Sequence, residues 1–179
     1  MEIIEKLIAD RVDWLGIEFA RMGWIRPERY CAECFEAQTR GEMVVLLARD
    51  DEKLLGCLRV VWNSDYAPFR EAMIPEIQDL IVAPASRRQG VASRLMDKAE
   101  AIIRTRSSVV GIGVGLHPGY GAAQRMYVLR GYVPDGNPLT YRDEFVNEGQ
   151  RVTLDDELTM HLTKQIWTVT RRSADSAPS

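Results

Sequence analysis

The sequence predicts a single α/β domain, with one mixed β-sheet flanked by helices. Strands and helices alternate through the middle of the chain, and strand pairs typical of antiparallel hairpins stand near both ends. The chain has 179 residues, of which 46% are hydrophobic, so it is long enough to bury one sizeable core. We place the domain at residues 1–170 and expect residues 171–179 to form a disordered tail.

The expected elements follow from hydrophobic spacing and from turn residues. Apolar residues three and four apart, from Ile8 to Met22, predict an amphipathic helix that Gly23 ends. Then follow, in order, a helix over 27–39, a hairpin over 43–62, a loop over 63–75, a strand over 76–82, a helix over 90–106, a strand over 109–116, a helix over 120–130, an acidic segment over 134–157 and a strand over 158–169. The two strands of the unit 76–116 should pair in parallel, and such sheets bind ligands at the carboxyl ends of these strands.

Composition argues against several classes of protein. The 23 Lys and Arg residues against 26 Asp and Glu give a net charge of −3, which argues against a nucleic-acid partner recognised through overall basicity. No apolar run is long enough to span a membrane, and residues 1–5 lack the basic start of a signal peptide. We therefore expect a cytoplasmic protein without a membrane partner.

Three cysteines and two histidines raise the question of a metal or redox site. Cys31 and Cys34 match C-x-x-C, and with His117 and His161 they would make four zinc ligands. These residues are scattered, however, and no second ligand pair accompanies them. We therefore interpret the cysteines, including Cys57, as packed thiols and expect no metal.

The segment after the 76–82 strand carries the clearest functional signal. It reads Ser86-Arg87-Arg88-Gln89-Gly90-Val91-Ala92-Ser93, so two arginines and a glycine stand where acidic residues would favour the positive end of a helix. Free N–H groups at a helix start bind anions, Gly90 lets a ligand approach the backbone, and arginines add charge-assisted hydrogen bonds. We interpret the loop as a pyrophosphate cradle, although by itself it would equally suit a solvated basic turn.

Two other phosphate-binding motifs do not fit. A P-loop needs a Gly-Lys pair, which the chain lacks. Gly111, Gly113 and Gly115 suggest a dinucleotide fingerprint, but they lie inside a predicted strand instead of opening a helix. Glycines within a strand more often mark the close approach of another group to the backbone.

Two motifs together closely resemble the GNAT superfamily of N-acetyltransferases. Arg87-x-x-Gly90-x-Ala92 is similar to the acetyl-CoA signature of that family, and the segment from Ala123 through Tyr127 to Gly131-Tyr132 is similar to its second motif. One helix, one strand and a short loop separate the two motifs, as in the family. The resemblance covers residues 54–133 well and implies a twisted mixed sheet whose two central parallel strands splay apart.

The resemblance also implies how acetyl-CoA would be held as a co-substrate. The pantetheine arm would pair with backbone groups of Leu80, Ile81 and Val82, and the Val82 N–H would bind the thioester oxygen. Many members carry a CoA-contacting Asn seven residues before the motif tyrosine, a position that Tyr120 occupies here. The implied pyrophosphate contacts are Arg87, Arg88, Gln89, Gly90, Val91, Ala92 and Ser93.

Two residues are implied as catalytic. Tyr127 matches the usual general acid for the departing thiolate, the alternative being a packed helix tyrosine. Glu76 lies eleven residues before Arg87, the position from which a strand carboxylate serves as base in some members; the alternative is a strand-end residue in solvent. His117 is a rival base or a plain loop histidine. Aromatic residues that either line the acceptor pocket or pack in the core are Trp24, Trp62, Tyr66 and Phe69.

The expected function is acetyl-CoA-dependent N-acetyltransfer to a primary amine, by direct attack in a ternary complex. A non-catalytic acyl-CoA-binding or sensing module is one alternative, and an acyltransferase that uses another acyl-CoA donor is a second. The acidic segment 134–157 has seven acidic residues against two arginines, which favours a small cationic amine over a protein; a solvated acidic loop explains it equally well. A homodimer is compatible with this interpretation.

Overall fold

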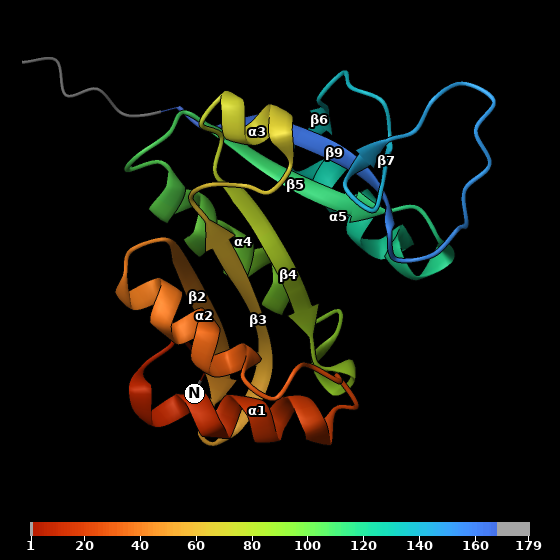
Figure 1. The fold of residues 1–179 in the computed structure, drawn as a ribbon. Helices are drawn as coiled ribbons and strands as arrows, with labels where there is room; N and C mark the ends of the chain where they lie inside the picture. Colours follow the sequence, from red (N-terminus) through yellow and green to blue (C-terminus); the bar gives the residue numbers. More distant parts are fainter. Residues whose placement is uncertain (1, 168–179) are drawn as a thin grey trace, which may run out of the picture.

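One open mixed sheet, in the order β1-β2-β3-β4-β5-β9-β7-β8, organises the computed structural model, which describes residues 2–167 (Figure 1). The strands are β1 (Glu2–Lys6), β2 (Met43–Asp50), β3 (Lys53–Val61), β4 (Glu76–Val82), β5 (Val109–Gly115), β6 (Val133–Pro134), β7 (Thr140–Tyr141), β8 (Glu144–Phe145) and β9 (Leu158–Gln165), and β6 pairs with β9 beside the main path. The α-helices are α1 (Val12–Arg21), α2 (Tyr30–Thr39), α3 (Ala67–Glu71), α4 (Val91–Ile103) and α5 (Gly121–Leu129). The predicted fold class is confirmed.

Helices cover both faces of the sheet, so its central strands are buried on both sides. Figure 1 shows α1 and α2 in front of β2 and β3, with α4 behind them. Neighbouring residues of β2 point to opposite faces: Leu46 belongs to the core under α4, and Leu47 belongs to the core under α1 and α2. Both side chains are fully buried, which explains why β2 is an unbroken apolar run in the sequence.

The two parallel strands at the centre of the sheet separate soon after they pair. β4 and β5 share only the pairs Glu76↔Gly111 and Ile77↔Ile112, and Figure 1 shows the strands running apart beyond them. The strands separate next to a bulge in the pairing of β3 with β4. Arg59 pairs with Gln78, whereas Cys57 pairs with Ile81, so β4 has one extra residue at this point. This geometry agrees with the splay that the resemblance implied.

Asp79 forms the bulge and holds an uncommon backbone conformation. Its φ is +52°, in the left-handed region, which costs a non-glycine residue about 1–2 kcal/mol. Tyr30 donates its hydroxyl to the Asp79 carboxylate, and Arg59 Nε lies 3.0 Å from Asp79 Oδ2. Contacts from α2 and β3 therefore hold the residue at which β4 leaves β5.

Several elements differ from the sequence-based expectations. β1 was not predicted, because its charged residues at positions 2, 5 and 6 hide the period of two that marks a strand. The segment 63–75 contains the short helix α3, with Pro68 in its first turn. β6 ends at the start of the acidic segment, which contains β7 and β8. The second helix begins at Tyr30, three residues later than predicted. The tail and the end of the last predicted strand, residues 168–179, lie outside the described residues.

A buried ionic network fixes α5 against α4 and β9. Glu100 of α4 is 5% exposed, and its Oε1 accepts hydrogen bonds from Arg130 and from the Tyr132 hydroxyl. Its other oxygen accepts a 2.7 Å hydrogen bond from Lys164 of β9. Because Arg130 and Tyr132 directly follow α5, this network holds the helix that carries Tyr127.

Candidate active site

The loop between β4 and α4 offers backbone donors to an anion. α4 begins at Val91 with no side-chain cap, since its N-cap residue is Gly90 at a φ of +81°. No hydrogen bond within residues 2–167 uses the N–H groups of residues 88–93. Arg87 and Arg88 beside them are exposed. Unpaired amides at the positive end of a helix, with two guanidinium groups next to them, fit the pyrophosphate of an acyl-CoA.

Next to this cradle, one edge of β4 is open. On the β3 side, Ile81 and Val82 pair with Cys57 and Gly56, whereas the pairing on the β5 side ends at Ile77. Leu80, Ile81 and Val82 are half-buried. An extended arm with amide groups can add to such an edge as a further strand would, and the pantetheine of CoA is an arm of this kind.

A cavity of about 510 Å³ lies where β4 and β5 diverge, and it brings together Glu76 and Tyr127. Leu80 and Tyr120 also line it, so two implied cofactor contacts face the same space. Further lining residues include Tyr66, Gln78, Gly113, Thr159 and His161. Candidate base, candidate acid and the open strand edge therefore share one cavity.

Glu76 is a buried carboxylate whose two oxygens have different surroundings. The residue is 5% exposed, so it is not a solvent-facing strand end. Its Oε2 accepts hydrogen bonds from Ser64 Oγ at 2.6 Å and from Gln78 Nε2 at 2.7 Å. Burial raises the pKa of Glu76, and these two bonds oppose the rise by stabilising the charged form. Its Oε1 lies 3.6 Å from the point that a Cβ on Gly113 would occupy.

Tyr127 offers a hydroxyl that nothing in the described part of the chain engages. The residue is 5% exposed, and its ring lies 5.8 Å from the ring of Tyr132 in a tilted arrangement. Burial raises the pKa of Tyr127, so the hydroxyl keeps its proton at neutral pH. It can donate that proton, or a hydrogen bond, to a group placed in the cavity.

His117 is already engaged through both ring nitrogens. Its Nδ1 accepts a hydrogen bond from the Gly119 N–H at 3.0 Å, so the proton of the neutral ring lies on Nε2, 2.8 Å from Asp156 Oδ1. The Tyr120 hydroxyl donates to the same oxygen at 3.1 Å. With neither nitrogen free to accept a proton from a substrate, this geometry favours Glu76 over His117 as the base.

This combination of fold and site agrees with a match to a known family. A sequence model of the Acetyltransferase (GNAT) family matches residues 10–132. The chain belongs to the GNAT acetyltransferase family. No curated protein matches the chain.

Solved structures of acetyltransferases share this fold. A putative GNAT acetyltransferase from Desulfovibrio desulfuricans aligns with a TM-score of 0.67 at 10% identity, covering 92% of this chain and 99% of its own. A PaiA N-acetyltransferase from Thermoplasma acidophilum, in complex with coenzyme A, gives 0.61 at 17% identity and covers 92% and 99%. A spermidine/spermine N-acetyltransferase from Vibrio cholerae gives 0.63 at 12% identity and covers 92% and 93%. At these identities the likeness establishes a shared GNAT fold.

The charged residues that line the cavity between β4 and β5 are mostly carboxylates. Among the described residues, Arg59 is the one Lys or Arg in this lining, and it is paired with Asp79. Asp155, although part of the acidic segment, instead accepts from the Tyr141 hydroxyl and from the Glu157 N–H. Carboxylates that line the cavity are Asp65, Glu76, Asp79, Asp143, Asp156 and Glu157.

Only part of the aromatic set considered from the sequence reaches this cavity. Tyr66 lines it. Phe69 is 1% exposed and packs where a side chain on Gly111 would stand. Trp62 packs beside the α4 core, with the Arg106 guanidinium 4.2 Å above its ring.

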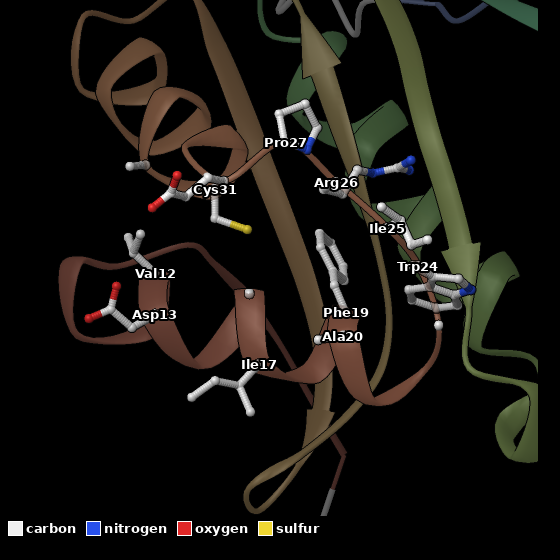
Figure 2. Close-up of a pocket in the computed structure, with 14 residues that line it drawn as sticks. Val12, Asp13, Ile17, Phe19, Ala20, Trp24, Ile25, Arg26, Pro27 and Cys31 are labelled. Carbon is white, nitrogen blue, oxygen red and sulfur yellow. The ribbon is translucent and has the colours of Figure 1, made fainter.

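Trp24 belongs to a second cavity, of about 610 Å³, between α1 and α2 (Figure 2). Figure 2 shows Phe19, Ile25 and Cys31 around it, with Asp13 on the α1 side. This cavity contains no residue of either GNAT motif and no open strand edge. The β4–β5 cavity is therefore the candidate active site.

The three cysteines do not line that site. Cys31, Cys34 and Cys57 are buried free thiols in the core under α1 and α2, and none of them lines the β4–β5 cavity. Burial raises the pKa of Cys31 to about 11, which disfavours the reactive thiolate. Residues 2–167 contain no group of three or more His, Cys, Asp and Glu side chains arranged for a metal ion. None of the helices over the same range is long and apolar enough to cross a membrane.

His161, which the sequence suggested only as a metal ligand, is a buried polar residue of the site. It lies on β9 opposite Gly113 of β5, is 6% exposed and lines the cavity. Burial lowers the pKa of His161 to about 4, so the ring is neutral at physiological pH. Its place in the site depends on strand pairing, which the sequence alone does not provide.

Proposed function

We propose that this protein is an acetyl-CoA-dependent N-acetyltransferase that acetylates a small cationic amine. The observation that carries the proposal is the shared cavity of Glu76 and Tyr127, next to the open edge of β4 and the cradle before α4. A sensing module would need the cradle and the open edge, but it would not need a buried carboxylate and a buried phenol facing one space.

Each residue has a defined part in the proposed reaction. Acetyl-CoA, when bound, supplies an activated thioester. Glu76 Oε1 accepts one proton from the substrate ammonium, directly or through a water. The nitrogen lone pair can then form the new N–C bond. As the C–S bond breaks, Tyr127 gives its proton to the leaving thiolate, and the second proton lost by the nitrogen restores Tyr127. The products are an N-acetyl amine, free CoA and one proton.

The lining of the cavity supports a cationic acceptor. Six carboxylates line it, and Arg59 is paired with one of them, Asp79. The other five leave the lining negative, so it attracts a cation and repels an anion. The Vibrio cholerae GNAT protein with this fold is named for acetylation of spermidine and spermine, which are cationic amines. Neither a nucleic acid nor a membrane is a proposed partner, in keeping with the net charge of −3.

A panel of amines with different charge tests the proposal. We would follow thiol release from acetyl-CoA with 1,4-diaminobutane, 2-aminoethanol, glycine and glutamate, and identify products by mass spectrometry. The proposal expects N-acetylation with kcat/KM highest for the dication and lowest for glutamate. Tight acetyl-CoA binding without transfer to any amine would favour the sensing module, and preference for succinyl-CoA in the same assay would favour another donor.

A further inference from the structure

His161 carries a buried nitrogen with no partner, and this needs a physical explanation. Its Nδ1 is inaccessible and makes no hydrogen bond within the part of the chain that the structure describes. A buried polar group without a partner loses its hydration and gains no hydrogen bond in return. A hydrophobic residue would avoid this cost, which points to a use for the other ring nitrogen, Nε2, that offsets it.

Packing alone holds the ring in a fixed orientation. It stacks on Tyr66 with centroids 3.5 Å apart and an angle of 2° between planes, and the edge of Phe69 meets it at 89°. The Tyr66 hydroxyl is itself fixed by a 2.8 Å hydrogen bond to Asp135. Aromatic neighbours therefore aim the imidazole without occupying its nitrogens.

The tip of this ring converges with the candidate base on one spot of the cavity floor. A Cβ on Gly113 would stand 3.5 Å from His161 Nε2 and 3.6 Å from Glu76 Oε1. β4 and β9 flank β5, so the two side chains reach over Gly113 from opposite sides. Because Gly113 has no side chain, the space between these two polar atoms stays open to a ligand.

We propose that His161 Nε2 accepts a hydrogen bond from the attacking nitrogen of the acceptor amine, while Glu76 Oε1 accepts another. This inference rests on the proposed function and names the contact that fixes the acceptor nitrogen above Gly113. A neutral imidazole protonated on Nδ1 presents a free acceptor at Nε2, and it does not repel a cationic substrate. Glu76 and His161 together then orient the nitrogen, and only Glu76 removes its proton.

Two substitutions at this position separate binding from packing. His161→Phe keeps an aromatic ring stacked on Tyr66 and removes the Nε2 acceptor. His161→Gln loses the ring stacking but keeps a side-chain oxygen that can accept a hydrogen bond. With the best amine of the panel, we expect His161→Phe to lower kcat/KM roughly 10- to 100-fold, mainly through KM, and His161→Gln to recover part of the loss. The dissociation constant for acetyl-CoA should stay within about twofold in both variants. Wild-type kcat/KM in a folded His161→Phe protein would overturn the proposal.

A second variant and a spectroscopic measurement keep the proposal testable if His161→Phe does not fold. Gly113→Ala should also raise the KM for the amine, because its Cβ would fill the spot and press on Thr159 Cγ2 at 3.0 Å. In the wild-type protein, which has two histidines, the ¹⁵N signal of His161 should shift when the amine is added to the CoA complex; His117→Gln assigns the signals. No shift under saturating amine would overturn the contact. A wild-type protein that acetylates no amine would refute the proposed function instead.

Discussion

Ser64 Oγ donates a 2.6 Å hydrogen bond to Glu76 Oε2, and the two residues are 1% and 5% exposed. This bond stabilises the charged form of a carboxylate whose burial favours the neutral form. It also leaves Oε1 as the oxygen that faces Gly113. The properties of the proposed base should therefore depend on Ser64.

Replacing Ser64 with alanine should move the pH dependence of catalysis. Because Glu76 must be deprotonated to act, kcat rises with pH through its pKa, which burial already raises. Losing the hydrogen bond to the charged form raises this pKa further, so we expect the acidic limb of the kcat profile in Ser64→Ala to shift upward by about one pH unit. Glu76→Gln should lack the limb and retain little activity. Ser107→Ala, whose hydroxyl bonds Val109 outside the cavity, is the matched control.

Replacing Tyr127 with phenylalanine should slow the reaction without weakening cofactor binding. The variant loses one proton donor and little shape, so kcat should fall about 10²–10⁴-fold, while the dissociation constant for acetyl-CoA stays near that of the wild type. Tyr132→Phe is the control, because its hydroxyl bonds Glu100 and lies in the ionic network under α5. Tyr132→Phe should lower the melting temperature and leave kcat close to that of the wild type. Equal kcat in Tyr127→Phe and the wild type would make Tyr127 a packing residue.

Replacing Gly90 with valine should weaken acetyl-CoA binding. A β-branched side chain at a φ of +81° is strained, and its Cβ would stand 2.7 Å from a guanidinium nitrogen of Arg94, at the start of the helix that offers the amides. Calorimetric titration should give a dissociation constant at least about tenfold higher. Gly149→Val is the matched control, since Gly149 has a φ of +79° and nothing within 4 Å of the added Cβ. Equal affinities in the two variants would refute the cradle.

Removing acidic charge from the cavity should blunt the salt dependence of catalysis. If Asp143 and Glu157 attract the cationic amine, kcat/KM should fall several-fold with rising ionic strength, as the Debye length shrinks from about 10 Å at 0.1 M to about 3 Å at 1 M. The double variant Asp143→Asn with Glu157→Gln should show a lower and flatter profile. Glu144→Gln with Glu148→Gln makes the same change of charge at exposed residues outside the lining. If the control shows the same salt dependence of kcat/KM as the test variant, the effect comes from net charge in general and not from the cavity.

Local patterns in the sequence predicted most of the fold and the loop before α4 that we interpret as the cradle. The helix and strand periods around residues 76–116 are strong, and the arginine and glycine spacing before Val91 is itself local. The bulge at Asp79 was not predictable in the same way, because it depends on the register of β3 against β4 and on partners from α2. Short strands such as β7 and β8 have too few residues to show a period.

The alternating glycines of β5 were the signal for the part of the site that was missed. Their interpretation as points of close approach agrees with the structure, since Phe69 packs over Gly111 and Tyr120 packs over Gly115. Between them, Gly113 faces both Glu76 and His161. The glycines in the sequence indicated where other groups approach β5. Which side chains approach there became clear only from the pairing of β9 with β5. The catalytic and cofactor-binding roles themselves stay predictions.

A single-turnover experiment distinguishes direct transfer of the acetyl group from cofactor to amine from transfer through an acylated protein. Enzyme in excess over ¹⁴C-acetyl-CoA is mixed with 1,4-diaminobutane, quenched on the millisecond scale, and separated into protein and small molecules. Because the three cysteines are buried and none lines the cavity, we expect label to pass from acetyl-CoA to the amine with no labelled protein at any time. Label that appears first on the protein and then on the amine would contradict it.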